Sequence, residues 1–240
     1  MAVVEWEKDG SVAVIKLNNG ENRQNPDFAK GLLTSLDAIL EDKDIYATII
    51  TSTDPKNWSQ GIDLEFLMGC FNAGDMQTIK DFMFSMNEVF KKLLLFPMPV
   101  IAAINGHAFG NGAILSCACD FRMMRSDRGY FCFPEVDLGI PFLPGMIAFV
   151  KKAIPYYRFN ELKLTGRRAT AVELEADHVI EKASENPEKL MEDALAFART
   201  FQKKRGIFGE HKKRLHKQIV EVIDTEDKPF IDSLFLFVQE

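Results

Sequence analysis

The sequence predicts an α/β fold in which strands and helices alternate around one core. Short β-rich runs alternate along the chain with longer runs of helical periodicity. One short run, Val100–Ile104, is almost wholly apolar, as expected for a strand covered on both faces. The chain has 240 residues and is 47% hydrophobic, so it can bury a sizeable core.

The first elements follow from local patterns. Val12–Leu17 alternates and is β-rich, which predicts a strand. Asn25 can cap a helix that has Pro26 at its first position. That helix keeps one face apolar through Phe28, Leu32, Leu36, Ile39 and Leu40. A second strand is expected at Tyr46–Thr51.

A long helix is expected from about residue 75 to residue 95, because apolar residues recur there at helical spacing until Pro97. Part of its Met and Phe stripe could line a ligand tunnel. The third strand is Val100–Ile104, and Phe121–Arg125 and Tyr130–Phe133 are two further candidate strands. From Leu143 onward the pattern is mainly helical. We therefore divide the chain into a core, residues 1–185, and a helical region, residues 186–240, expected to act in oligomerisation.

Composition excludes several classes of protein. The formal net charge of −6 argues against a nucleic-acid partner and against an anionic membrane surface. The four cysteines form neither a CxxC pair nor a spaced framework, which indicates free thiols in a reducing compartment. The chain begins without a signal-peptide pattern and has no charge-free run of transmembrane length. These features predict a cytoplasmic protein.

The run NGHAFGNGAILSCACD, residues 105–120, holds three closely spaced glycines between an apolar strand and a helix pattern. No HExxH metal motif, GxSxG elbow, P-loop or GxGxxG fingerprint occurs in the chain, and the histidines suggest no metal site. What remains is a site built from backbone N–H groups. The loops at 58–64 and 106–112 are the two candidates, and the second opens into a helix N-terminus.

At these loops the sequence resembles the crotonase (enoyl-CoA hydratase/isomerase) superfamily. Four segments carry the resemblance in order and spacing: WSQGIDL at 58–64, INGHAFGNGAILSCACDFRMM at 104–124, FPEVDLGI at 133–140 and LTGRRATAVELEADHVI at 164–180. The resemblance implies a spiral of ββα turns with a helical C-terminal trimerisation region. It also implies an acyl-CoA thioester as substrate in fatty acid metabolism, no cofactor or metal, and a homotrimer or dimer of trimers.

By position, the resemblance implies that two backbone N–H groups, those of Ile62 and Asn111, form an oxyanion hole for the thioester. The family usually has glycine where this chain has Asn111. Residues expected to contact the substrate are Arg23, Gln24, Asn25, Gln60, Gly61, Asp63, Leu64, Gly110 and Ile114. From the residues alone, Arg23 is slightly better explained as an ordinary solvated charge, and Asp63 can be a helix N-cap that shapes the loop, which is a structural and not a catalytic role.

The family's hydratases hold a water between two glutamates. One of these positions is Ile114 here, whereas the other is kept as Glu135. A single carboxylate can carry a proton from one carbon to another, which resembles the Δ3,Δ2-enoyl-CoA isomerases. Apolar neighbours, Phe131, Phe133 and Val136, are expected to raise the pKa of Glu135 toward a useful value.

Two alternatives stay open. The same fold and oxyanion hole could perform hydration, thioester hydrolysis or C–C cleavage, with a second polar group from Asp137 or from the loop at 140–147. The nearby Asp137 is better explained as a cap for the following segment. The chain could also be an acyl-CoA-binding or assembly protein without activity.

Overall fold

The computed structural model describes residues 2–238. Its main sheet has six strands in the order β1-β2-β4-β7-β9-β11, in which β1 pairs antiparallel with β2 and all other neighbours are parallel. These strands are β1 (Val4–Asp9), β2 (Val12–Leu17), β4 (Ala47–Ser52), β7 (Val100–Ile104), β9 (Phe121–Arg125) and β11 (Lys182–Ser184). The predicted α/β class is confirmed.

Two small sheets lie beside the main one and carry the loops of interest. One has the order β10-β8-β5 and the other pairs β3 with β6. Their strands are β3 (Arg23–Gln24), β5 (Asn57–Ser59), β6 (Gly61–Ile62), β8 (His107–Phe109) and β10 (Phe131–Cys132). Because β5 pairs in parallel with β8, the segments around residues 60 and 110 come together.

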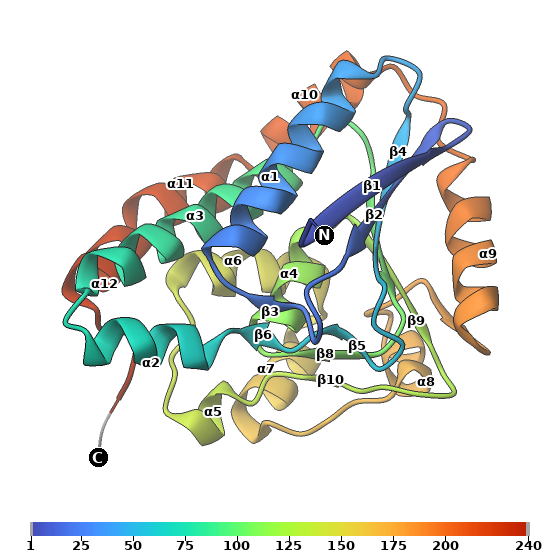
Figure 1. Ribbon diagram of the computed structural model, residues 1–240. Coiled ribbons are helices and arrows are strands. Elements are labelled where there is room, and N and C mark those ends of the chain that lie inside the picture. The colour runs from blue at the N-terminus through green and yellow to red at the C-terminus, as the bar shows by residue number, and fades with distance from the viewer. Residues whose placement is uncertain (1, 239–240) are drawn as a thin grey trace.

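Helices cover both faces of the main sheet (Figure 1). They are α1 (Pro26–Glu41), α2 (Leu64–Asn72), α3 (Met76–Leu95), α4 (Asn111–Ala118), α5 (Glu135–Leu138), α6 (Pro144–Ala153), α7 (Tyr156–Thr165), α8 (Ala171–Ala176), α9 (Pro187–Ala198), α10 (Arg205–Leu215), α11 (Lys217–Thr225) and α12 (Asp227–Ser233). Alternation along β2 sends Val12 and Val14 toward a small core under α9, whereas Ala13 and Ile15 join the larger core under α1 and α3.

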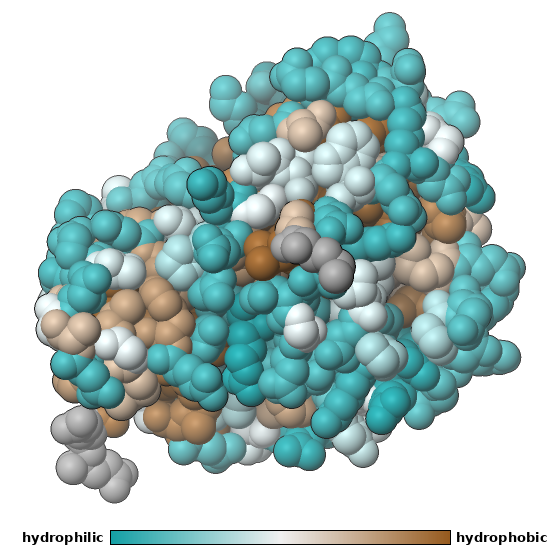
Figure 2. Space-filling view, viewed as in Figure 1, coloured by the Kyte–Doolittle hydropathy of each residue, from teal (hydrophilic) through white to brown (hydrophobic). Residues whose placement is uncertain are grey.

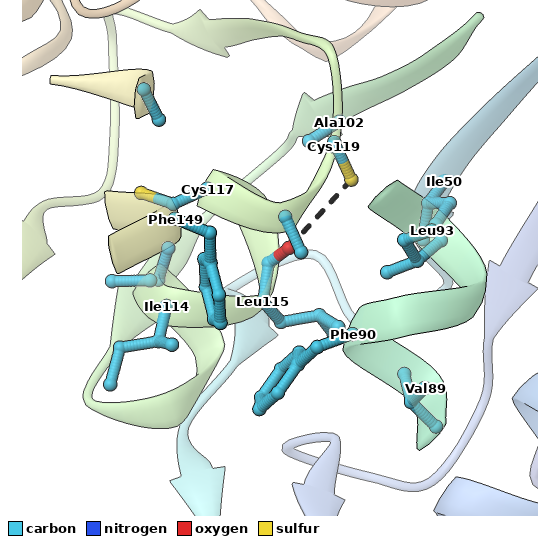
Figure 3. Close-up of a cluster of buried hydrophobic side chains, with 14 of the residues drawn as sticks. Ile50, Val89, Phe90, Leu93, Ala102, Ile114, Leu115, Cys117, Cys119 and Phe149 are labelled. Carbon is cyan, nitrogen blue, oxygen red and sulfur yellow. Dashed lines mark hydrogen bonds between the residues drawn. The ribbon is translucent and has the colours of Figure 1, made fainter. Parts of the chain in front are cut away.

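Helix α4 runs through the centre of the larger core. All eight of its residues are buried, and Figure 3 shows its Leu115 beside Phe90 of α3, with Phe149 of α6 close by. Cys119, just beyond α4, approaches the Leu115 carbonyl oxygen at 3.7 Å between Sγ and O. The cysteines of this segment therefore serve as small core residues.

Several predicted elements are confirmed, whereas β1, β11 and the short strands β3, β5, β6 and β8 were not predicted. The helix cap at Asn25, the long helix α3 and the strands β2, β7 and β9 occur where the sequence predicts them. Val4–Asp9 forms an edge strand that the sequence analysis did not predict. The expectation of mainly helical structure after Leu143 is confirmed by α6 to α12, and the short strand β11, which pairs with β9, was not predicted.

The region from residue 186 packs on the rest of the chain. Helix α9 buries Leu190, Ala194 and Ala198 against the main sheet, and α10, α11 and α12 contact α3 or α6. A role of this region in oligomerisation stays a prediction. Within residues 2–238, no helix combines the length and apolar character that crossing a lipid bilayer requires.

The face shown in Figure 2 is mostly hydrophilic, but apolar side chains gather on its left side, over α2 and α3. Exposed apolar residues of α2 are Leu64, Met68 and Phe71. Leu64 also lines the cavity described next, so this apolar surface continues into the interior.

Candidate active site

A cavity of about 190 Å³ lies where the two small sheets meet α2, α4, α5 and the chain's C-terminal segment. Most of its wall is apolar, and the polar side chains on it number four: Arg23, Gln60, Asn111 and Glu135. A mostly apolar wall with a few placed polar groups is typical of a small-molecule site.

Glycines let the two loops come close enough to share one wall. Gly61 has φ +81°, and a Cβ there would lie 2.8 Å from the Phe109 carbonyl oxygen and 3.0 Å from the Asn111 nitrogen. A Cβ at Gly112 would lie 2.3 Å from the Ser59 carbonyl oxygen. No side chain fits between these backbones. The close approach therefore explains why this stretch of the sequence is so rich in glycine.

The two predicted N–H donors both belong to residues of the cavity wall. Asn111 is the first residue of α4, so its N–H has no acceptor within the helix, and its N-cap, Gly110, offers no side chain. The partial positive charge of the helix N-terminus adds to this donor. Ile62 lies between Gly61 and Asp63, whose own amide donates to the Gln24 carbonyl oxygen at 2.9 Å.

Gln24 holds the second loop in place from behind. Its Oε1 accepts from Nδ2 of Asn111 at 2.5 Å, and its Nε2 donates to Oγ of Ser59 at 3.2 Å and to the Asn111 carbonyl oxygen at 3.3 Å. Gln24 is fully buried and does not line the cavity. It is therefore a positioning residue whose hydrogen bonds connect the start of α4, at Asn111, to β5, at Ser59.

Glu135 begins α5 and is only 8% exposed. Its Oε2 is buried without a hydrogen-bond partner, and its Oε1 lies next to Gly110, where a Cβ would be 3.3 Å away. Burial raises the pKa of Glu135 from 4.5 to about 7. The weaker opposing causes are a backbone hydrogen bond and the positive charge of Lys163. A carboxylate of this kind can both take up and release a proton near neutral pH.

One expected neighbour of Glu135 was assigned wrongly. Phe131 and Phe133 are fully buried, but Val136 is 49% exposed and does not shield the carboxylate. The chain leaves its strand at Cys132 and enters the helical turn α5, so Val136 faces outward. Phe142 and Leu143, which the sequence analysis did not name, line the same cavity as Glu135.

No second acid faces Glu135 among the described residues that line the cavity. Ile114 is buried on its wall, as the sequence predicts for an apolar side chain at that position. Asp137 lies within α5, and its carboxylate points to Gly166 and lines a neighbouring surface hollow. Its expected role as a cap of the following segment was wrong, because it belongs to the helical turn itself.

The structure brings part of the predicted substrate-binding set to the cavity. The wall includes Arg23, Gln60, Leu64, Gly110 and Ile114. Gln24, Asn25, Gly61 and Asp63 lie outside it. Asn25 caps α1 by accepting from the Phe28 amide at 3.0 Å, and the predicted cap at Asp63 is confirmed by two bonds of 3.1 Å from the first turn of α2. Substrate contact by any of these residues stays a prediction.

The sequence analysis did not identify most of the apolar wall. The residues missed are Leu67, Phe109, Pro134, Leu138, Ile140, Pro141, Phe142, Leu143, Met146, Leu236 and Phe237. The one indication in the sequence was the row of Met and Phe residues along α3, which we expected to line a tunnel in part. Met83 is the residue of that row that lines the cavity. Within residues 2–238, no group of three or more His, Cys, Asp or Glu side chains could hold a metal ion.

Comparisons with known proteins point to one family. Residues 7–228 match the family described as enoyl-CoA hydratase/isomerase. Enoyl-CoA delta isomerase 2, peroxisomal, from Arabidopsis thaliana is 31% identical over 189 residues, which cover 76% of this chain and 78% of that protein. Short-chain-enoyl-CoA hydratase from Clostridium acetobutylicum is 36% identical over 138 residues, 56% of this chain and 50% of that protein.

The fold also has solved counterparts. The crystal structure of an enoyl-CoA hydratase from Bacillus halodurans superimposes with a TM-score of 0.85 and 23% identity, over 97% of this chain and 93% of that one. At this level of identity the likeness establishes the fold alone.

Proposed function

The chain belongs to the enoyl-CoA hydratase/isomerase family, and on that premise we propose that it moves the double bond of a 3-enoyl-CoA into conjugation, which gives the 2-enoyl-CoA. The observation that carries this proposal is that Glu135 is the one acid among the described residues of the cavity wall. A shift of a double bond needs one group that takes a proton and returns it. Addition of water needs a second group that activates the water.

The proposed reaction begins with a carbon acid. The C2 proton of a 3-enoyl thioester is acidified by both the carbonyl group and the alkene. Glu135 removes it, and the electron pair spreads over a dienolate whose oxygen accepts hydrogen bonds from the N–H groups of Ile62 and Asn111. Loss of one such donor typically costs about 3 kcal/mol of transition-state stabilisation. The protonated Glu135 then delivers its proton to C4, so that the substrate gains and loses one proton.

The raised pKa of Glu135 supports this role. Near pH 7 a group with a pKa of about 7 is present in both forms, so it can act as base in the first step and as acid in the second. The apolar wall supports it too, because it keeps water from the dienolate. The proposed reaction moves protons only and calls for neither a metal nor a redox cofactor.

Hydration is the second candidate, and one observation favours it: a relative that shares 36% identity over half of its length is named a hydratase. Without a second acid, the polar side chains left on the wall to orient a water are Arg23, Gln60 and Asn111. The third candidate is acyl-CoA binding without turnover. Binding alone does not require a buried carboxylate with a raised pKa, so Glu135 speaks against this candidate.

The test supplies purified protein with a 3-enoyl-CoA and, separately, with a 2-enoyl-CoA, and follows products by mass and by ultraviolet absorbance. We expect conjugation of the 3-enoyl substrate at unchanged mass, and its loss in Glu135→Gln. Asp137→Asn is the matched control, because it removes an acid two residues away that does not line the cavity. A mass gain of one water on the 2-enoyl substrate would instead identify a hydratase, and binding without turnover would favour the third candidate.

We also propose that the chain assembles as a homotrimer or a dimer of trimers, through its helical C-terminal region. Light scattering on the purified protein measures this mass directly. A monomer at micromolar concentration would contradict the proposal.

A further inference from the structure

The last described residues of the chain contribute to the cavity wall. Beyond α12 the chain turns at Leu234, which has φ +54°, and continues as the segment Phe235–Val238, here called the terminal segment. Figure 1 shows this segment, in red, emerging below α2. Leu236 is 8% exposed and Phe237 is 51% exposed, and both side chains line the cavity. Phe237 therefore stands between the cavity and solvent.

The terminal segment is fixed at both ends. At its far end the Val238 amide donates to the Gly139 carbonyl oxygen at 2.8 Å, directly after the helical turn that carries Glu135. The packing there is close, since a Cβ at Gly139 would lie 2.9 Å from the Val238 carbonyl oxygen. The place of Phe237 is thus set relative to the proposed catalytic carboxylate.

At its near end the segment is held through α12. The buried Asp227 accepts from the Gly145 amide at 2.7 Å and from Nδ2 of Asn87 at 3.1 Å. Gly145 lies between Leu143 and Met146, two residues of the cavity wall. Helix α12 is therefore tied to the same structure that forms the apolar part of the cavity.

The bond between Val238 and Gly139 places the terminal segment beside Leu138 and Ile140, which also line the cavity. The wall further includes the apolar side chains of Phe142, Leu143 and Met146. The cavity of about 190 Å³ is smaller than the roughly 300–1,000 Å³ of sites for drug-sized ligands. A chain that enters it has a limited length before it meets the wall.

We propose that Leu236 and Phe237 close the acyl end of the substrate site, and that Phe237 sets the longest acyl chain that fits. The ligand class follows from the proposed function, an acyl-CoA thioester. Removal of the half-exposed Phe237 ring would open the cavity to solvent and give a longer chain an exit. A larger ring at this position would shorten the cavity.

The test measures binding, so that it does not depend on isomerase activity. Butanoyl-, hexanoyl- and decanoyl-CoA are titrated by calorimetry into the unaltered protein, Phe237→Ala and Phe237→Trp. We expect the affinity for decanoyl-CoA relative to hexanoyl-CoA to rise at least about tenfold in Phe237→Ala, and to fall in Phe237→Trp, because single methylenes are distinguished by such factors in apolar pockets. Phe235→Ala is the matched control, since Phe235 lies in the same segment and does not line the cavity.

The outcomes separate the two proposals. Opposite shifts in length preference for the two Phe237 variants, with Phe235→Ala unchanged, support the role of Phe237 whether or not the protein isomerises its ligand. Binding with the same length preference in all variants overturns the role of Phe237 and leaves the proposed function intact. Failure of the unaltered protein to bind any of the three acyl-CoA ligands overturns both.

Discussion

Replacement of Glu135 by glutamine is expected to stabilise the folded protein at neutral and alkaline pH while it removes the proposed activity. The carboxyl group is buried and its Oε2 has no partner, so the folded state disfavours its charged form. Burial raises the pKa of Glu135 from 4.5 to about 7, which corresponds to a cost of about 3 kcal/mol for burying its ionised form. Glutamine keeps the shape of the side chain and carries no charge at any pH.

The pH dependence of this gain in stability follows from proton binding by Glu135. Between pH 4.5 and about 7 the folded state holds the Glu135 proton and the unfolded state releases it, so the free energy of unfolding falls as pH rises through this window. Above pH 7 both states are ionised and the full cost remains. The gain in unfolding free energy in Glu135→Gln is therefore expected to be about 1 kcal/mol at pH 5 and about 3 kcal/mol at pH 8.

Urea unfolding at pH 5 and pH 8, at one protein concentration, measures this difference. Asp137→Asn is the control, because it removes an exposed carboxylate from the same helical turn and should change stability by less than about 0.5 kcal/mol. A Glu135→Gln gain that is equal at both pH values would refute the reasoning, since a cost of burying charge must vanish where the group is protonated. A loss of stability at pH 8 would show that the carboxylate has a partner.

Three further results are expected. The kcat/KM of the proposed isomerisation should rise with pH and level off above an apparent pKa of about 7, because the free enzyme must hold Glu135 as a base; a flat profile from pH 5 to 8 would exclude it. Gly112→Ala should abolish activity or folding, because its Cβ would lie 2.3 Å from the Ser59 carbonyl oxygen. The control is Gly69→Ala on α2, where a Cβ would have nothing within 4 Å; in urea unfolding it should be neutral or stabilising by up to about 1 kcal/mol. Lys212→Ala should lower the free energy of unfolding, measured in urea, by about 3–5 kcal/mol, because the buried Nζ of Lys212 pairs with Oδ2 of Asp120 at 2.7 Å. Lys213→Ala, at an exposed position, is the control and should change it little. Equal effects of the two variants would show that the buried ion pair does not contribute to stability.

Local patterns in the sequence were sufficient for much of the fold. The cap at Asn25 and the prolines after α3 act through neighbouring residues, so their effect can be read without tertiary structure. The same is true of the apolar run of β7. In contrast, the strand Val4–Asp9 depends on pairing with β2 along its whole length, and its alternating charged residues gave no core-facing pattern to recognise.

The candidate site divides in the same way. The glycines of the two loops and Glu135 lie in short motifs, so a resemblance could identify them. Val136 shows the limit of such reasoning, because proximity in sequence to Glu135 did not place it in the cavity once the strand gave way to the helical turn α5.

The sequence by itself therefore determined the α/β class, the two backbone loops and the presence of one candidate proton carrier. Only the tertiary structure decided which apolar residues form a cavity rather than solid core, because Met83, Met146 and Phe237 lie far apart in the chain and have no distinguishing local pattern. It also decided the burial of Glu135, and with it the pKa of about 7. Burial is the sum of contacts from many segments, and a linear sequence does not state which segments will meet.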